Sequence, residues 1–236
     1  MIARWMIAGF VLWAALTLSF RFAATEWTSW LFIVGPLVMF VLTHLLLEMF
    51  RVERSDRGEA ASIFALPGLL IGIYEINSFR FVFPNLDPAL GINFAALMFA
   101  CYVAVILAGL VASARWMIAG FVLWLALTVS LRFFGHYIFH VGPDGMTWMF
   151  IIAPLAMLAV TYVLLKVFGV ESADRAEAAA VFAVPGLLVG IYEIISFDVV
   201  FPNLNPSLGI NFAALMFACY AAIIFAGIAS SRLKSI

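Results

Sequence analysis

The sequence FALPGLLIGIYEINSF, at residues 64–79, decides how the rest of this chain is interpreted. It returns at residues 182–197 as FAVPGLLVGIYEIISF, and each copy is followed by an FPN turn and a second apolar segment. Thirteen residues of that second segment, 90–102, recur unchanged at 208–220. Each copy therefore predicts an apolar helix interrupted by Pro-Gly, a short turn and another apolar helix. The chain as a whole is predicted to be an internal duplication.

The composition is typical of a membrane protein. Of the 236 residues, 67% are hydrophobic and only 11% are charged. The mean hydropathy is +1.17, well outside the range of soluble domains. Between Asp87 and Arg115 there is no charged residue, and this segment exceeds the ~20 residues that cross a ~30 Å hydrocarbon core. The sequence therefore predicts a multi-pass helical membrane protein.

The repeat divides the chain into two halves, residues 1–113 and 114–236, each predicted to contribute four membrane-spanning helices. The segment ARWMIAGFVLW at residues 3–13 recurs at 114–124, where it must be retained, so the first apolar segment is expected to be a span and not a cleaved signal. An even number of spans inserts both halves in the same direction. We therefore predict an all-α protein of eight transmembrane helices, built as two parallel four-helix repeats related by a pseudo-two-fold axis along the membrane normal.

The two halves are expected to pack against each other as an internal pseudo-dimer. The longest unchanged segments belong to the first, fourth, fifth and eighth predicted helices. A symmetric contact uses the same surface on both sides, so it would keep the same sequence in both copies. These four helices are therefore predicted to form the contact between the halves, through small residues that let backbones approach closely.

Charge distribution sets the expected orientation and excludes one class of partner. Of the twelve Lys and Arg residues, only Arg21, Arg80 and Arg132 fall on the side opposite the termini. The positive-inside rule therefore predicts that both termini are cytoplasmic and that the FPN turns face outward. A net charge of -1 with no basic patch argues against nucleic-acid binding. The expected partners are the lipid bilayer and, as a further possibility, other membrane subunits.

Two glutamates are the main candidates for a functional site. Glu75 and its repeat equivalent Glu193 lie within apolar helices, where a carboxylate costs about 2.5–3.5 kcal/mol on insertion scales. Arg21 and Arg132 lie at a similar depth on the first helix of each half. The favoured interpretation is a structural ion pair in each half, Arg21 with Glu75 and Arg132 with Glu193. The alternatives are a proton- or cation-binding carboxylate pair near the axis and a ligand- or lipid-binding site. The repeated polar neighbours that could complete any of these sites are Tyr74, Tyr192, Asn93 and Asn211.

No sequence motif points to catalysis. The chain has no nucleophile elbow, phosphate loop, HExxH or CxxC motif. Its two cysteines, Cys101 and Cys219, are repeat equivalents inside apolar helices and are interpreted as small packing residues. We therefore expect no enzymatic activity, no bound metal and no cofactor.

Several short segments resemble a known family. They are LRFFGHYIFHVGP at 131–143, VPGLLVG at 184–190, VFPNL at 200–204 and NFAALMFACY at 211–220. Together they resemble a family of small bacterial four-helix membrane proteins of unknown function, described from RFFGxYxF, PGxxL and FPN elements. The second half resembles the family throughout, and the first half lacks only the GHYIF portion. The resemblance implies a four-helix fold for each half and a location in the bacterial inner membrane, but no activity.

Three functional classes follow from these observations. The favoured one is a non-catalytic structural or accessory membrane protein whose polar residues hold helices together. The first alternative is a small ion- or proton-coupled transporter or channel that uses the paired glutamates. The second is a binder of an apolar ligand or pigment, suggested by 24 Phe and 7 Trp residues.

Overall fold

The computed structural model describes residues 2–23, 30–109, 114–139 and 143–232. The first half of this described chain contains helices α1 (Ile2–Ala23), α2 (Leu31–Met49), α3 (Arg57–Asn77), α4 (Phe79–Val82) and α5 (Gly91–Gly109). The second half contains α6 (Ala114–Ile138), α7 (Pro143–Val167), α8 (Arg175–Ile195), α9 (Phe197–Val200) and α10 (Gly209–Arg232). Eight of these helices, all but α4 and α9, are long and apolar enough to cross a membrane. The predicted all-α fold of two four-span repeats is confirmed.

Helix boundaries differ from the prediction at two kinds of position. The Pro-Gly pairs do not interrupt their helices, because α3 continues through Pro67 and α8 through Pro185. Packed neighbouring helices allow a transmembrane helix to tolerate such a proline. The interruption falls later, at Ser78 and Ser196, which have non-helical backbone angles and separate α3 from α4 and α8 from α9. The reversal predicted at residues 112–114 lies largely outside the described residues.

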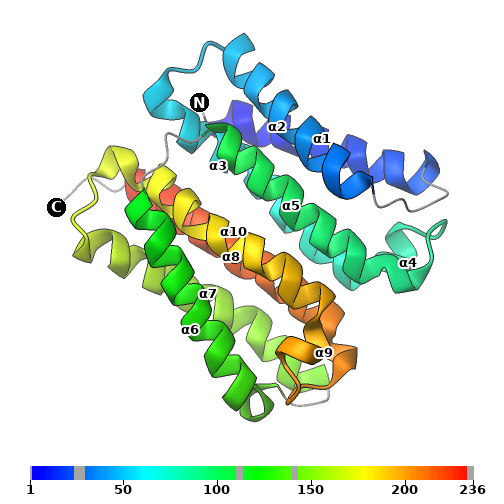
Figure 1. Ribbon diagram of the computed structural model, residues 1–236. Coiled ribbons are helices and arrows are strands. Elements are labelled where there is room, and N and C mark those ends of the chain that lie inside the picture. The colour runs from blue at the N-terminus through cyan, green and yellow to red at the C-terminus, as the bar shows by residue number, and fades with distance from the viewer. Residues whose placement is uncertain (1, 24–29, 110–113, 140–142, 233–236) are drawn as a thin grey trace.

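The eight long helices form an inner and an outer layer. The inner layer consists of α3, α5, α8 and α10. Of the residues in their membrane-spanning segments, 72–78% are buried. The outer layer consists of α1, α2, α6 and α7, which are only 11–17% buried. Each outer helix rests mainly on one inner helix: α1 on α3, α2 on α5, α6 on α8 and α7 on α10. In Figure 1 the α1–α2 pair and the α6–α7 pair accordingly flank the inner helices from two sides.

The two halves meet through the inner helices, with α3 against α10 and α5 against α8. At the centre, the fully buried rings of Phe99 and Phe217 stack with their centroids 4.4 Å apart. The ring of Tyr102 meets Phe217 edge-on at 5.5 Å, and that of Tyr220 meets Phe99 edge-on at 5.7 Å. This exchange of equivalent contacts is what a pseudo-two-fold axis produces.

The prediction that α1 and α6 also join the halves is wrong, since both lie in the outer layer. Their shared sequence serves a contact that is made once within each half. Gly9 of α1 lies against the backbone carbonyl oxygen of Phe64, and Gly120 of α6 lies in the same way against that of Phe182. A Cβ atom at either glycine would collide with that oxygen, so only glycine permits this approach of two helices.

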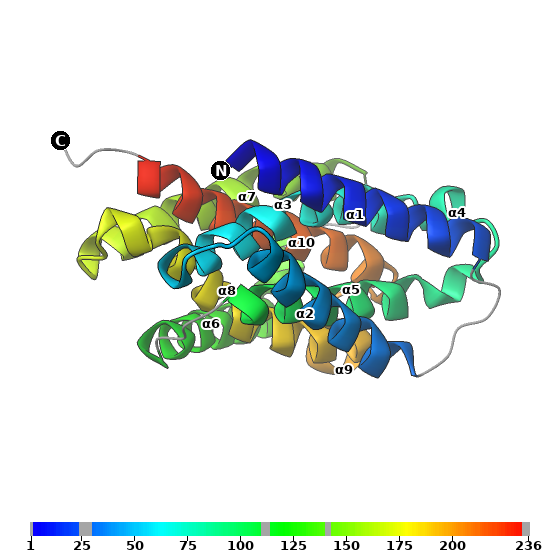
Figure 2. The same cartoon turned by 90° about the horizontal axis from the view of Figure 1, so that it is seen from above.

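The beginning of α1 and the end of α10 lie at the end of the molecule opposite the FPN turns. In Figure 1 the beginning of α1 and the end of α10 are found at one end and α4 and α9 at the other, and Figure 2 shows the same separation between the beginning of α1 and α4. At the terminal end, Arg232 of α10 forms an ion pair with Glu59 of α3 and so ties the second half to the first. The FPN end is held within each half by hydrogen bonds that are described below.

Candidate functional site

Each predicted glutamate is buried in its own half. Glu75 of α3 is 3% exposed and Glu193 of α8 is 1% exposed. The hydroxyl of Thr17 on α1 forms a hydrogen bond with Glu75 Oε1, and the hydroxyl of Thr128 on α6 does so with Glu193 Oε1. An uncharged hydroxyl, and not a basic side chain, is therefore the hydrogen-bond partner that these carboxyl groups share.

The threonine hydroxyl can form a hydrogen bond with the carboxyl group in either protonation state. Thr17 Oγ1 also lies 2.9 Å from the backbone carbonyl oxygen of Trp13, one turn earlier on α1. A hydroxyl group has one proton to donate and two lone pairs that accept. It donates to an ionised Glu75, but it accepts from a protonated Glu75 and then donates to the Trp13 carbonyl. The hydrogen bond between Thr17 and Glu75 can thus form in either protonation state, whereas the bond to the Trp13 carbonyl forms only when Glu75 carries the proton.

The two halves differ in what the tryptophan does. In the second half, the indole Nε1 of Trp124 donates to Glu193 Oε2 at 3.1 Å. In the first half, the equivalent Trp13 is 5% exposed, and its Nε1 has no hydrogen-bond partner among the described residues. Glu75 therefore has one oxygen bonded to Thr17, and its other oxygen is not bonded to the indole.

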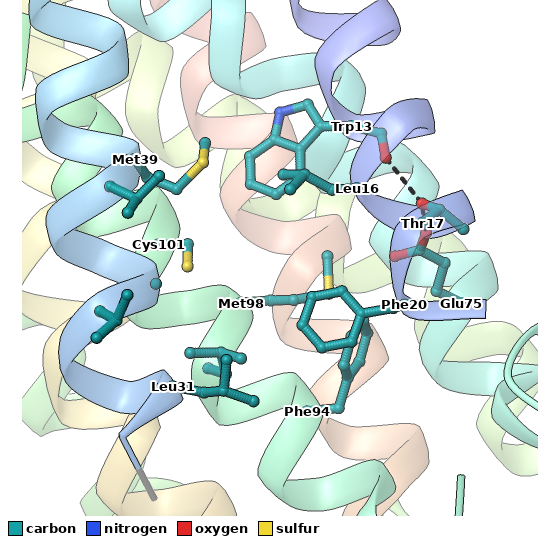
Figure 3. A pocket seen from close by; sticks show the side chains of 14 residues that line it. Trp13, Leu16, Thr17, Phe20, Leu31, Met39, Glu75, Phe94, Met98 and Cys101 are labelled. Carbon is teal, nitrogen blue, oxygen red and sulfur yellow. Dashed lines mark hydrogen bonds between the residues drawn. The ribbon is translucent and has the colours of Figure 1, made fainter. Parts of the chain in front are cut away.

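A cavity of about 220 Å³ lies beside Glu75, between α1 and α2 and against α3 and α5. In Figure 3 the rings of Trp13 and Phe20 border it on the α1 side, and Leu31 and Met39 border it on the α2 side. The full lining is Trp13, Leu16, Thr17, Phe20, Leu31, Val34, Gly35, Val38, Met39, Glu75, Phe94, Leu97, Met98 and Cys101. Glu75 is the only ionisable carboxyl group among these lining residues, and no Lys, Arg or His is present.

The predicted ion pairs do not form. Arg21 is a described residue, but its Nη1 donates to the backbone carbonyls of Phe81 and Val82, at 2.9 and 2.8 Å. Arg132 does the same in the second half, at 2.9 Å to Val199 and 2.7 Å to Val200. The reason is that α4 and α9 end at these positions, and the last carbonyls of a helix have no partner within it. Arg21 and Arg132 are therefore structural residues of the FPN end.

The FPN asparagine completes a reciprocal set of hydrogen bonds there. Asn85 Nδ2 donates to the carbonyl of Phe20 near the end of α1, at 2.9 Å. Asn203 donates to the equivalent carbonyl of Leu131 at 3.0 Å. The arginine thus donates hydrogen bonds to the last carbonyls of α4 or α9. The asparagine donates one to a carbonyl in the last turns of α1 or α6. This exchange gives the arginine and the FPN turn a common structural role.

The other predicted polar neighbours do not join the carboxyl groups. Tyr74 and Tyr192 are 63% and 60% exposed and face away from the protein interior. Asn93 and Asn211 are half-buried, and neither is hydrogen-bonded to Glu75 or Glu193 among the described residues. Of the eight predicted site residues, only the two glutamates therefore occupy the candidate sites, one in each half.

Sequence reasoning missed the tryptophan and threonine of each site. Trp13, Thr17 and Arg21 are spaced four residues apart, which places them on one face of α1. The same spacing recurs in α6 with Trp124, Thr128 and Arg132. A search for polar or aromatic residues at i, i+4 and i+8 in both repeats would have found them.

Aromatic rings connect the two sites across the middle of the molecule. The ring of Trp13 lies 4.6 Å from Tyr102, and that of Trp124 lies 5.4 Å from Tyr220. The central stack of Phe99 and Phe217 joins these two pairs. The carboxyl groups therefore lie in separate sites and do not form a single paired site on the axis.

The fold and these sites define a polytopic helical membrane protein made of two repeats, each with one buried carboxyl group held by a threonine. The chain belongs to a family of unknown function, DUF5367, whose sequence pattern matches residues 19–116 and again residues 139–234. The family resemblance expected from the sequence is thus confirmed in two tandem copies. Comparison with curated proteins gives no match, and neither does comparison with solved structures.

Proposed function

We propose that this protein is a non-catalytic membrane protein that binds a small, largely apolar molecule in the cavity beside Glu75. Such a protein belongs to the third functional class predicted from the sequence, a binder of an apolar ligand, and its role is more than structural or accessory. The observation that carries the proposal is the cavity itself, with one carboxyl group in an otherwise mainly apolar lining. Such a space forgoes van der Waals contacts that would otherwise hold α1 and α2 against the inner helices.

The size of the cavity suits an aromatic ring with a small substituent. An apolar cavity of about 150 Å³ inside a protein stays dry and binds benzene. The cavity beside Glu75, at about 220 Å³, has room for a somewhat larger molecule. Its walls come in part from α1 and α2, which are mostly exposed to the surroundings of the bundle. A ligand dissolved in the bilayer would therefore reach the cavity from the lipid side.

A transporter or channel that uses both glutamates has weaker support. Such a function is favoured when two carboxyl groups share a site or a polar path. Here Glu75 and Glu193 lie in different halves, and the rings of Tyr102, Phe217, Phe99 and Tyr220 stand between their sites.

Filling the cavity should abolish binding. A Cβ atom at Gly35 would lie 3.2 Å from Leu97 Cδ1, the end of a flexible side chain, so a larger side chain there would extend into the cavity. We expect the full-length protein in lipid nanodiscs to bind fluorobenzene saturably by ¹⁹F NMR, and Gly35→Leu to lose this binding. Ala153, the repeat equivalent of Gly35, provides the matched control, and Ala153→Leu should bind as the unchanged protein does. Absence of saturable binding in the unchanged protein would refute the proposed function.

We further propose that the protein resides in the bacterial inner membrane with both termini in the cytoplasm. The charge distribution and the shared end of the first and last helices support this orientation. Ala89 in the FPN region and Ser55 in the loop before α3 are both exposed and lie at opposite ends of the bundle.

An impermeant maleimide should therefore label Ala89→Cys in intact cells. It should label Ser55→Cys only after the membrane is opened. The native cysteines are mostly buried, so the unchanged protein serves as the background control. The reverse pattern of labelling would invert the orientation.

A further inference from the structure

The available oxygen of Glu75 points to the chemistry of the ligand. Oε1 of Glu75 is bonded to Thr17, whereas Oε2 has no hydrogen bond among the described residues and belongs to a side chain that lines the cavity. The nearest basic residue along α1, Arg21, is held by the carbonyls at the end of α4. A carboxylate in an apolar cavity is stabilised by a cation that enters with the ligand.

Aromatic rings in the same cavity provide the second element of recognition. Trp13, Phe20 and Phe94 all line it. The faces of aromatic rings attract cations, Trp most strongly, and clusters of such rings are how proteins bind quaternary ammonium groups. Three rings and one carboxyl group, with no basic side chain in the lining, are complementary to an organic cation and not to an anion.

We infer that the ligand of this cavity is a small organic ammonium ion, with its cationic group at Glu75 and its apolar part among the rings. This inference rests on the proposed function, which it makes more specific. The cavity volume limits the ligand to about one aromatic ring or a similar alkyl group beside the ammonium centre.

In the second half, the equivalent tryptophan donates a hydrogen bond to the second oxygen of the glutamate. Nine of the fourteen lining residues are identical at the equivalent positions of the second half, among them Trp124, Thr128 and Glu193. There the indole N–H is bonded to Glu193 Oε2, the oxygen that would receive the ligand. The indole therefore takes the position of the ammonium group, and the intact protein should bind one ligand per chain.

Benzyltrimethylammonium is a suitable probe because neopentylbenzene has the same shape without the charge. We expect the full-length protein in lipid nanodiscs to bind radiolabelled benzyltrimethylammonium, and neopentylbenzene to compete at least about tenfold less well. Glu75→Gln should weaken binding of the cation by at least about tenfold, because one member of a buried charge pair is removed. Glu53→Gln removes an exposed carboxylate outside the cavity and should leave the affinity unchanged.

The possible results separate this inference from the proposed function. Equal affinity for the two probes, together with no effect of Glu75→Gln, would refute the ammonium ligand while leaving an apolar binding site. Failure of both probes to bind would refute both proposals. If the Glu75→Gln variant still binds neopentylbenzene, the cavity of the variant is intact. A loss of cation binding by the same variant then supports the inference.

A second variant tests the site of the second half. Trp124→Phe removes the indole N–H from Glu193 and retains an aromatic ring. We expect this variant to bind two benzyltrimethylammonium ions per chain, where the unchanged protein binds one. A stoichiometry of one in both proteins would overturn the inference that the indole occupies the ligand's position.

Discussion

Gly120→Val should destabilise the protein by about 3 kcal/mol or more, one of the two largest effects that we expect from a single substitution. A side chain at residue 120 would meet the backbone carbonyl oxygen of Phe182, because α6 and α8 touch at this point. Overpacking a buried position typically costs about 1–3 kcal/mol, and the upper end applies where the obstacle is backbone that cannot rotate away. Thermal unfolding in mild detergent, followed by circular dichroism, would measure the loss.

Ile118→Val, two residues earlier on α6, is the control for this experiment. Ile118 is 64% exposed, so its shortening should change the free energy of unfolding by less than about 0.5 kcal/mol. If Gly120→Val unfolded at the same temperature as Ile118→Val, α6 could not approach α8 as closely as the structure shows.

Phe217→Ala should destabilise the protein by a comparable amount through a different mechanism. Phe217 is fully buried between the halves and stacks on Phe99. Replacing a buried phenylalanine by alanine costs about 3–5 kcal/mol. Inside a membrane the loss is mainly one of van der Waals packing, which is what holds transmembrane helices together. We expect a lower unfolding temperature and a looser association of the two halves.

The double variant distinguishes a specific stack from general loss of bulk. Because Phe99 and Phe217 touch each other, Phe99→Ala and Phe217→Ala together should cost less than the sum of the two single changes. Phe10→Ala is the matched control, since Phe10 is 58% exposed on α1 and should contribute little. Strictly additive effects would contradict the direct contact between the rings.

Hydropathy was sufficient to predict the eight spans, because each long apolar helix must reach across the bilayer. Repeat identity was not sufficient to predict where the halves meet. The segment around Gly9 and Gly120 is the same in both copies, but it serves contacts within each half. The identical segment around Phe99 and Phe217 does join the halves. Identity between repeats shows that a contact occurs twice, and it does not show whether the contact crosses the axis.

The sequence was sufficient to predict the glutamate of each candidate site, but it was not sufficient to predict the hydrogen-bond partners of that glutamate. A buried glutamate in an apolar helix is visible in any sequence. The hydrogen-bond partner of Glu75 depends on how α1 is rotated about its axis and on where α4 ends. The depth of a residue in the membrane indicates neither of these. Arg21 lies one turn beyond Thr17, where the unsatisfied carbonyls of a four-residue helix receive it. The break at Ser78 that creates this helix leaves no hydropathy signal.

The layered arrangement has a consequence for how the nascent chain enters the bilayer. In each half the two outer helices are synthesised before the two inner ones, and the outer helices are those that can face lipid without partners. The segment containing α3 has a mean hydropathy of 1.4, the lowest of the eight spans, and carries Glu75, so it is the least able to remain in lipid alone. By the time α3 leaves the ribosome, α1 has already been made and can present the hydroxyl of Thr17 to that carboxyl group. Each helix that carries a buried glutamate, α3 or α8, is therefore synthesised after the helix that supplies its threonine, α1 or α6.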